Sequence, residues 1–180
     1  MSNSDPASVF AMCLGPGGPG DPAGPGENSL ADGDASCTGA EVAALISANS
    51  RAFAGQGVGA GTLVAIPAVR SAATVVAVLS LWAVGAAYLP VAVGGRPAGD
   101  VPPVDRVLRL GNGTELHLDA PPVHLARRPG DPACVIGEEL LGAAEHPDEL
   151  PAYVMRTSGS TGPAKYPVIT RGGRSSPRSA

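Results

Sequence analysis

The stretch Arg156–Lys165 reads RTSGSTGPAK and combines hydroxyl side chains, glycines and a lysine. Glycines let backbone N–H groups turn toward an anion, and hydroxyl groups add further donors. A lysine ammonium at the end of such a loop neutralises a phosphate as a point charge. The stretch therefore indicates phosphate binding, with a Ser/Gly-rich linker as the alternative. The residues that would bind phosphate are Thr157, Ser158, Gly159, Ser160, Thr161, Gly162 and Lys165.

The residues before this stretch favour the phosphate loop over the linker. Pro151–Arg156 (PAYVMR) predicts a strand that runs directly into Thr157. The spacing differs from the Walker A motif, which requires GxxxxGK followed by Ser or Thr.

The chain has 180 residues, enough for one domain with a core, and a net charge of −4. This charge gives no reason to expect a nucleic-acid partner. Neither the cysteines nor the histidines have the spacing of a zinc site, and isolated thiols suit a reducing cytoplasm. The start of the chain lacks the pattern of a signal peptide, so we expect a cytoplasmic protein. These scattered residues are Cys13, Cys37, Cys134, His117, His124 and His146.

Composition divides the chain into three parts. Residues 1–37 include LGPGGPGDPAGPGE and have little apolar surface to bury, which predicts a disordered Gly/Pro-rich arm. Residues 38–173 carry the predicted α/β domain, and residues 174–180 read as an unrelated polar tail.

The first part of the domain predicts a helix followed by a strand. Thr38 and Glu41 form a capping-box pattern, and Gly55 and Gly57 are expected to end the helix. Thr62–Ala68 (TLVAIPA) then predicts a short buried strand.

The next stretch, Ser71–Gly95, contains no charged residue. Its length would allow a membrane anchor, which we keep as an alternative. Gly85 and Pro90 interrupt it, however, and favour a buried helix over Ser71–Val84, a tight turn at Gly85 and a strand over Ala86–Val91.

Two further elements are expected downstream. Alternating apolar residues in Asp105–Asp119 surround Asn112-Gly113 and predict a β-hairpin. Cys134–His146 predicts a short helix.

Three segments resemble the adenylate-forming, AMP-binding superfamily in the order in which its members carry them. Val154–Lys165 (VMRTSGSTGPAK) is similar to the AMP-binding signature. Leu81–Val91 (LWAVGAAYLPV) is similar to a motif of nonribosomal peptide synthetase adenylation domains, and Val42–Val69 resembles their first helix and strand. The resemblance covers about Thr38 to Gly173.

The resemblance implies a partial N-terminal subdomain, with a parallel sheet and flanking helices. It also implies ATP, Mg²⁺ and a carboxylic acid, favouring an amino acid, as the reactants that form an acyl adenylate. The loop residues named above would hold the β- and γ-phosphates and stabilise the departing pyrophosphate.

The sequence departs from the family pattern at several positions. Arg156 replaces a tyrosine or similar residue, Ala164 a proline and Tyr166 a glycine. Upstream, Trp82 stands where lysine is common and Ala92 where aspartate is usual. Loss of the glycine would restrict the loop.

The family's downstream motifs, of the types YGxTE and TGD, are absent from the 180 residues. We therefore expect an N-terminal fragment that is inactive alone. A second polypeptide that completes the site and a phosphate-binding module without catalysis are the alternatives.

Overall fold

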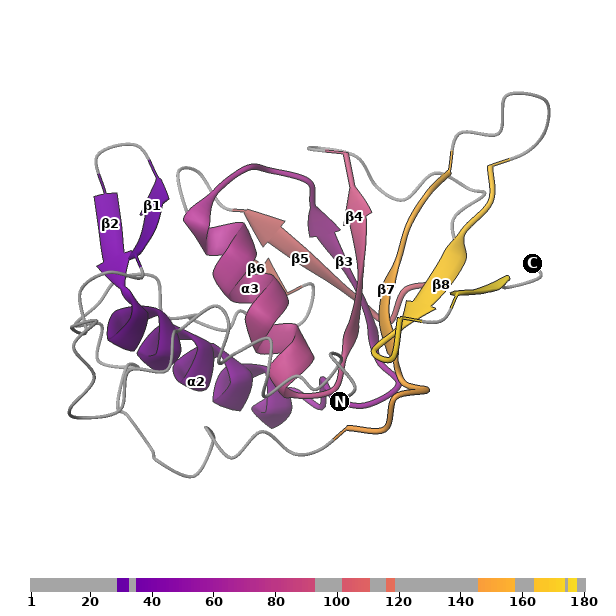
Figure 1. The fold of residues 1–180 in the computed structure, drawn as a ribbon, viewed down its shortest axis with the longest axis horizontal. Helices are drawn as coiled ribbons and strands as arrows, with labels where there is room; N and C mark the ends of the chain where they lie inside the picture. Colours follow the sequence, from indigo (N-terminus) through magenta and orange to yellow (C-terminus); the bar gives the residue numbers. More distant parts are fainter. Residues whose placement is uncertain are drawn as a thin grey trace.

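The computed structural model describes residues 29–32, 35–92, 102–110, 116–118, 146–157, 164–173 and 175–177 (Figure 1). The turn predicted at Asn112-Gly113 and all of the helix predicted at Cys134–His146 except its last residue lie outside this part. The elements are β1 Ser29–Asp32, β2 Ala35–Thr38, α2 Gly39–Gly55, β3 Leu63–Pro67, α3 Ala72–Ala83, β4 Ala87–Val91, β5 Arg106–Leu110, β6 Leu116–Leu118, β7 Pro151–Val154, β8 Pro167–Thr170 and β9 Ser175–Pro177.

A seven-stranded sheet with the order β6-β5-β3-β4-β7-β8-β9 forms the centre of the described fold. Its four middle strands, β5, β3, β4 and β7, are parallel, which confirms the predicted α/β class. The sheet as a whole is mixed, because β6 pairs antiparallel with β5, and β8 and β9 extend the other edge in antiparallel fashion. The pairing of β5 with β6 matches the predicted hairpin.

Both helices begin with a capped first turn, and the cap of α2 is the capping box that the sequence predicted. The Thr38 backbone N–H donates to Glu41 Oε2 at 2.7 Å, and the Glu41 N–H donates to Thr38 Oγ1, which completes a capping box. Ser71 caps α3 by accepting a hydrogen bond from the Thr74 N–H. These caps satisfy N–H groups that a helix leaves without partners in its first turn.

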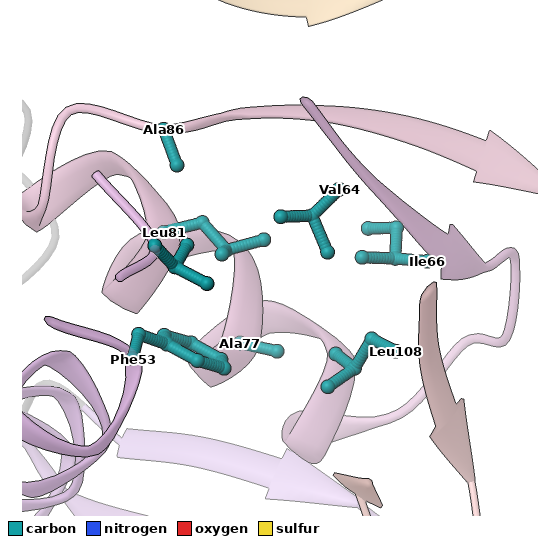
Figure 2. Packing of buried hydrophobic residues seen from close by; sticks show 8 residues of the cluster. Phe53, Val64, Ile66, Ala77, Leu81, Ala86 and Leu108 are labelled. Atoms are coloured by element: carbon teal, nitrogen blue, oxygen red, sulfur yellow. The ribbon is translucent and has the colours of Figure 1, made fainter. Parts of the chain in front are cut away.

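The main hydrophobic cluster lies between the sheet and the helices. Figure 2 shows side chains from α2, α3, β3 and β5 pointing toward one another. Phe53 and Val64 are fully buried there, and Leu108 joins them from β5. The large apolar residues of α2 are all buried, namely Val42, Leu45, Ile46 and Phe53.

The face of the sheet opposite the helices carries another apolar cluster, which we call the loop-side cluster. It consists of the buried residues Leu63, Ala87, Leu89, Val154, Tyr166 and Val168. Strand alternation explains the division, because Val64 joins the helix side while its neighbour Leu63 joins the opposite side.

The uncharged stretch Ser71–Gly95 folds as a helix, a turn and a strand over its described residues. Gly85 adopts a φ of +80°, which a tight turn between α3 and β4 requires. Among the residues that the structure describes, no helix has the length and hydropathy needed to cross a bilayer.

Three strands lie in segments for which the sequence predicted no ordered structure. β1 and β2 pair as a hairpin within residues 29–38, where Leu30 and Cys37 pack against apolar residues of α2 and α3. β9 lies in the predicted polar tail and pairs with β8. Backbone pairing of this kind does not depend on an apolar side-chain pattern, which explains why composition alone missed it.

Candidate functional site

The two ends of the predicted phosphate loop are held together by β7 and β8. Val154 pairs with Val168 in the antiparallel ladder, and beyond it the Met155 N–H donates to the Pro167 carbonyl at 3.2 Å. Thr157 and Lys165 then form a further bridge. The ladder therefore continues past the named strands to the base of the loop.

Thr157 and Lys165 are joined by two hydrogen bonds to one acceptor. The Thr157 N–H donates to the Lys165 carbonyl oxygen at 2.9 Å, and Thr157 Oγ1 donates to the same oxygen at 3.2 Å. Both residues are exposed, so the lysine ammonium is accessible to a ligand. Lys165 is also the only lysine in the sequence.

This pair lies at the carboxyl end of β7, which runs parallel to β4. In α/β proteins with parallel strands, ligands bind outside the carboxyl ends of the strands. Figure 1 shows the same edge, where β7 leads upward into the loop and β8 returns from it. The position of Thr157 and Lys165 thus matches that of a ligand-binding loop.

The structure brings together two of the seven predicted site residues. Thr157 and Lys165 face each other, whereas Ser158, Gly159, Ser160, Thr161 and Gly162 lie outside the described residues. For these five, phosphate binding stays a prediction.

The departures from the family pattern next to the lysine take part in packing. Tyr166 is 9% exposed and belongs to the loop-side cluster, and Ala164 packs against that cluster. Because Val154 pairs with Val168 and Thr157 with Lys165, the same register sets Arg156 opposite Tyr166. Arg156 is exposed.

Trp82, another departure, links α3 to β7. Its Nε1–H donates to the Ala152 carbonyl at 3.0 Å. Its ring lies 6.1 Å from that of Tyr88, which stacks on Tyr153 with centroids 5.7 Å apart. Burial, and secondly the Tyr153 phenol, raises the pKa of Tyr88. This aromatic row supports β7, the strand that precedes Thr157. Local sequence carries no signal for it, because the three rings come from separate elements.

Two side chains from distant segments reach the carboxyl end of α3. Arg171 Nη2 donates to the Trp82 carbonyl at 2.7 Å, and a ring nitrogen of His146 lies 3.2 Å from the Ala83 carbonyl oxygen. Carbonyl groups in the last turn of a helix lack partners within the helix, and cationic side chains there are favourable. Burial lowers the pKa of the Arg171 guanidinium. These contacts hold α3 against the β7–β8 region.

A small apolar pocket of about 70 Å³ is lined by residues of β3, β4, β7 and β8 and by two residues that precede β3. No titratable side chain lines it, so it offers no group for acid–base or phosphate chemistry. Its lining residues are Gly61, Thr62, Leu63, Ala87, Pro151, Val154 and Val168.

The described residues contain no group of three or more His, Cys, Asp or Glu side chains that could hold a metal ion. Within this part of the chain, a divalent cation therefore has no ready-made carboxylate site.

Comparison with curated proteins shows similarity to two proteins, one named as a synthase and one as a probable synthetase. The chain is 39% identical over 123 residues to the phenyloxazoline synthase MbtB of Mycolicibacterium paratuberculosis, a match that covers 63% of this chain and 10% of that protein. It is 31% identical over 171 residues to the probable non-canonical nonribosomal peptide synthetase CymA of Salinispora arenicola, covering 83% of this chain and 2% of that protein. The chain thus spans a small part of these relatives. No protein-family model matches it.

Comparison with solved structures shows similarity of fold. A variant of MenE from E. coli with bound OSB-AMS is 26% identical with a TM-score of 0.53, over 77% of this chain and 30% of that one. The four-domain nonribosomal peptide synthetase AB3403, bound to AMP and glycine, is 23% identical with a TM-score of 0.53, over 76% of this chain and 10% of that one.

Proposed function

Because this chain belongs to the AMP-binding, adenylate-forming superfamily, we propose that it holds the phosphates of ATP while a carboxylic acid is activated. In this reaction a carboxylate oxygen attacks the α-phosphorus and forms a new P–O bond. The bond from the α-phosphorus to the bridging oxygen breaks, and its electron pair leaves with pyrophosphate. The products are an acyl adenylate and pyrophosphate.

The Thr157–Lys165 pair is the observation that carries this proposal. The two hydrogen bonds to the Lys165 carbonyl hold a hydroxyl-bearing residue and the lysine at the base of the loop. The ammonium neutralises charge that develops on the leaving pyrophosphate, and preorganised donors stabilise such charge without reorganisation. We assign the same role to the backbone and hydroxyl groups of Ser158, Gly159, Ser160, Thr161 and Gly162.

We propose that Mg²⁺ reaches the site bound to the phosphates of ATP. The described residues offer no cluster of acidic side chains for it, and Mg²⁺ commonly binds through substrate phosphates and few protein ligands. Bound there, the ion would supply further positive charge to the leaving group.

We further propose an amino acid as the carboxylate substrate. The support is the similarity to two proteins named as a phenyloxazoline synthase and a nonribosomal peptide synthetase. The loop binds phosphate and does not select the acid, so the choice of acid depends on residues other than those in Thr157–Lys165.

Calorimetric titration with MgATP tests binding by the unaltered chain. The matched variants are Thr157→Val, which removes the hydroxyl at nearly constant volume, and Lys165→Met, which removes the charge. Because both residues are exposed, we expect the global fold to be unchanged. Lys165→Met should weaken MgATP binding about tenfold through loss of a charge-assisted contact, and Thr157→Val should weaken it less, through loss of the hydroxyl that bonds the Lys165 carbonyl. Arg70→Met, at an exposed position outside the loop, is the control and should bind as the unaltered chain does. Equal binding by all four proteins would exclude the loop as the site.

Exchange of labelled pyrophosphate into ATP, with a panel of amino and other carboxylic acids, tests catalysis. We expect no exchange by the chain alone, because the sequence lacks the YGxTE and TGD types of motif, and exchange after addition of a polypeptide that supplies them. Exchange by the chain alone would disprove its inactivity. MgATP binding without exchange under every condition would favour a nucleotide-binding module.

A further inference from the structure

Tyr166 lies directly after the only lysine, at the point where β8 leaves the loop. Its side chain is 9% exposed and packs in the loop-side cluster with Val154 and Val168. Ala164, on the other side of the lysine, packs against the same cluster. Lys165 is therefore flanked by two residues that are held on one side of the sheet.

The burial of Tyr166 determines the direction of the Lys165 side chain. Neighbouring side chains in an extended segment point to opposite sides, so burial of Tyr166 directs Lys165 away from the loop-side cluster. The Lys165 carbonyl then lies where it accepts both hydrogen bonds from Thr157. A glycine in place of Tyr166 would have no side chain to bury and would leave this segment with more conformational freedom.

We propose that Tyr166 is a positioning residue, whose buried ring holds Lys165 opposite Thr157 and so fixes the cation at the phosphate site. The role of Lys165 at a phosphate site rests on the proposed function, whereas the packing of Tyr166 and the contact between Lys165 and Thr157 are observed in the structure. The ring, and not the hydroxyl, performs this role. Tyr166 Oη is buried and has no hydrogen-bond partner within the described part of the chain.

Three variants of Tyr166 separate the contribution of the ring from that of the unpartnered hydroxyl. Tyr166→Phe keeps the ring and removes a buried polar atom, so its stability should equal or exceed that of the unaltered chain. Tyr166→Gly removes the ring, and Tyr166→Val retains part of the apolar side chain and a high strand preference. Val168→Ala is the matched control, because it truncates a residue of the same cluster that lies in β8, two positions farther from the loop.

Amide hydrogen exchange measured by NMR separates local from global effects. The Thr157 N–H reports on the base of the loop, and the Ala87 N–H, which donates to the Thr62 carbonyl at 2.9 Å, reports on the sheet centre. We expect exchange at Thr157 to accelerate about tenfold or more in Tyr166→Gly and less in Tyr166→Val, with Ala87 nearly unchanged. Tyr166→Phe should match the unaltered chain, and Val168→Ala should not reproduce the effect at Thr157.

Cleavage by a lysine-specific protease gives a second measurement, because Lys165 is its only site. For each variant, the cleavage rate of the folded chain is divided by the rate of the same chain unfolded in urea. This ratio cancels the protease's own preference for the residue at position 166, which follows the cleaved bond. We expect this ratio to rise in Tyr166→Gly by a factor similar to the acceleration of amide exchange at Thr157. In Tyr166→Phe the ratio should equal that of the unaltered chain.

Equal acceleration at Thr157 and Ala87 in both Tyr166→Gly and Tyr166→Val would overturn the proposal, because Tyr166 would then be a general core residue. Unchanged exchange at Thr157 in both variants would overturn it as well. Failure of the proposed function gives a different result. The unaltered chain would not bind MgATP, whereas the exchange and cleavage differences among the Tyr166 variants would persist.

Discussion

Arg171 Nη2 donates a 2.7 Å hydrogen bond to the carbonyl oxygen of Trp82, which joins residues 89 positions apart in the sequence. The contact connects the turn after β8 to the carboxyl end of α3. Trp82 in turn donates from its indole N–H to Ala152 in β7. Trp82 therefore forms hydrogen bonds both with β7 and with the turn that follows β8, the two strands on either side of the predicted loop.

Replacement of Arg171 by methionine should destabilise the fold. Hydrogen bonds to charged groups contribute more than neutral ones, but Arg171 is only half-buried, so we expect a loss of about 1 kcal/mol in the free energy of unfolding. Urea denaturation followed by circular dichroism measures it. Arg70→Met changes an exposed arginine and should have little effect. Equal losses in the two variants would show that the contact with Trp82 contributes nothing specific.

Substitutions at Trp82 separate its hydrogen bond from its packing. Trp82→Phe keeps an aromatic ring near Tyr88 but loses the bond to Ala152, so we expect a loss of about 1 kcal/mol. Trp82→Lys introduces the residue common in the family and loses ring packing as well. It should be less stable than Trp82→Phe by a further ~1 kcal/mol. Thermal unfolding of the three proteins measures the order, and a lysine variant as stable as the phenylalanine variant would contradict it.

Gly85→Ala should destabilise the turn between α3 and β4 for two reasons. Its φ of +80° is strained for alanine, and the new Cβ would lie 2.8 Å from His146 Cε1 and 3.3 Å from the Ala60 Cα. We expect a loss of about 2–4 kcal/mol. Gly57→Ala is the control, because Gly57 has a φ of +73° with open space around it, and strain alone should cost about 1 kcal/mol. Equal losses in urea denaturation would exclude a contribution from the close approach of His146.

Stability should fall at alkaline pH through Tyr88. Its pKa is raised in the folded state, so the unfolded chain releases the proton first as the pH increases. The contribution to folding is complete below about pH 10, the ordinary tyrosine value, and is lost as the pH rises through the folded value. Urea midpoints between pH 8 and 11 should therefore decline less in Tyr88→Phe.

Cys37 contributes to the same range, because burial, and secondly Glu41, raises the pKa of its thiol. Its contribution is lost as the pH rises from about 9 upward. Cys37→Ala therefore serves as the background in which the effect of Tyr88 is measured. An unchanged pH slope on replacing Tyr88 in that background would contradict the prediction.

Local sequence patterns were sufficient for the elements whose signals lie within a few residues. Thr38 with Glu41 predicted the start of α2, and Gly85 predicted the turn before β4. The period-two pattern around Asn112-Gly113 predicted the antiparallel pairing of β5 with β6. Each signal is a contact or a backbone angle between near neighbours, so it is visible without the fold.

The sequence by itself determined the residue types of the loop, its position after a strand and the resemblance to adenylate-forming enzymes. Only the tertiary structure decided that Lys165 lies opposite Thr157, that Tyr166 is buried beside it and that Arg171 reaches Trp82. The physical reason is that strand register and burial depend on which distant segments meet. Which segments meet is determined by the free energy of packing the whole chain, and it cannot be read from the local periodicity of the sequence.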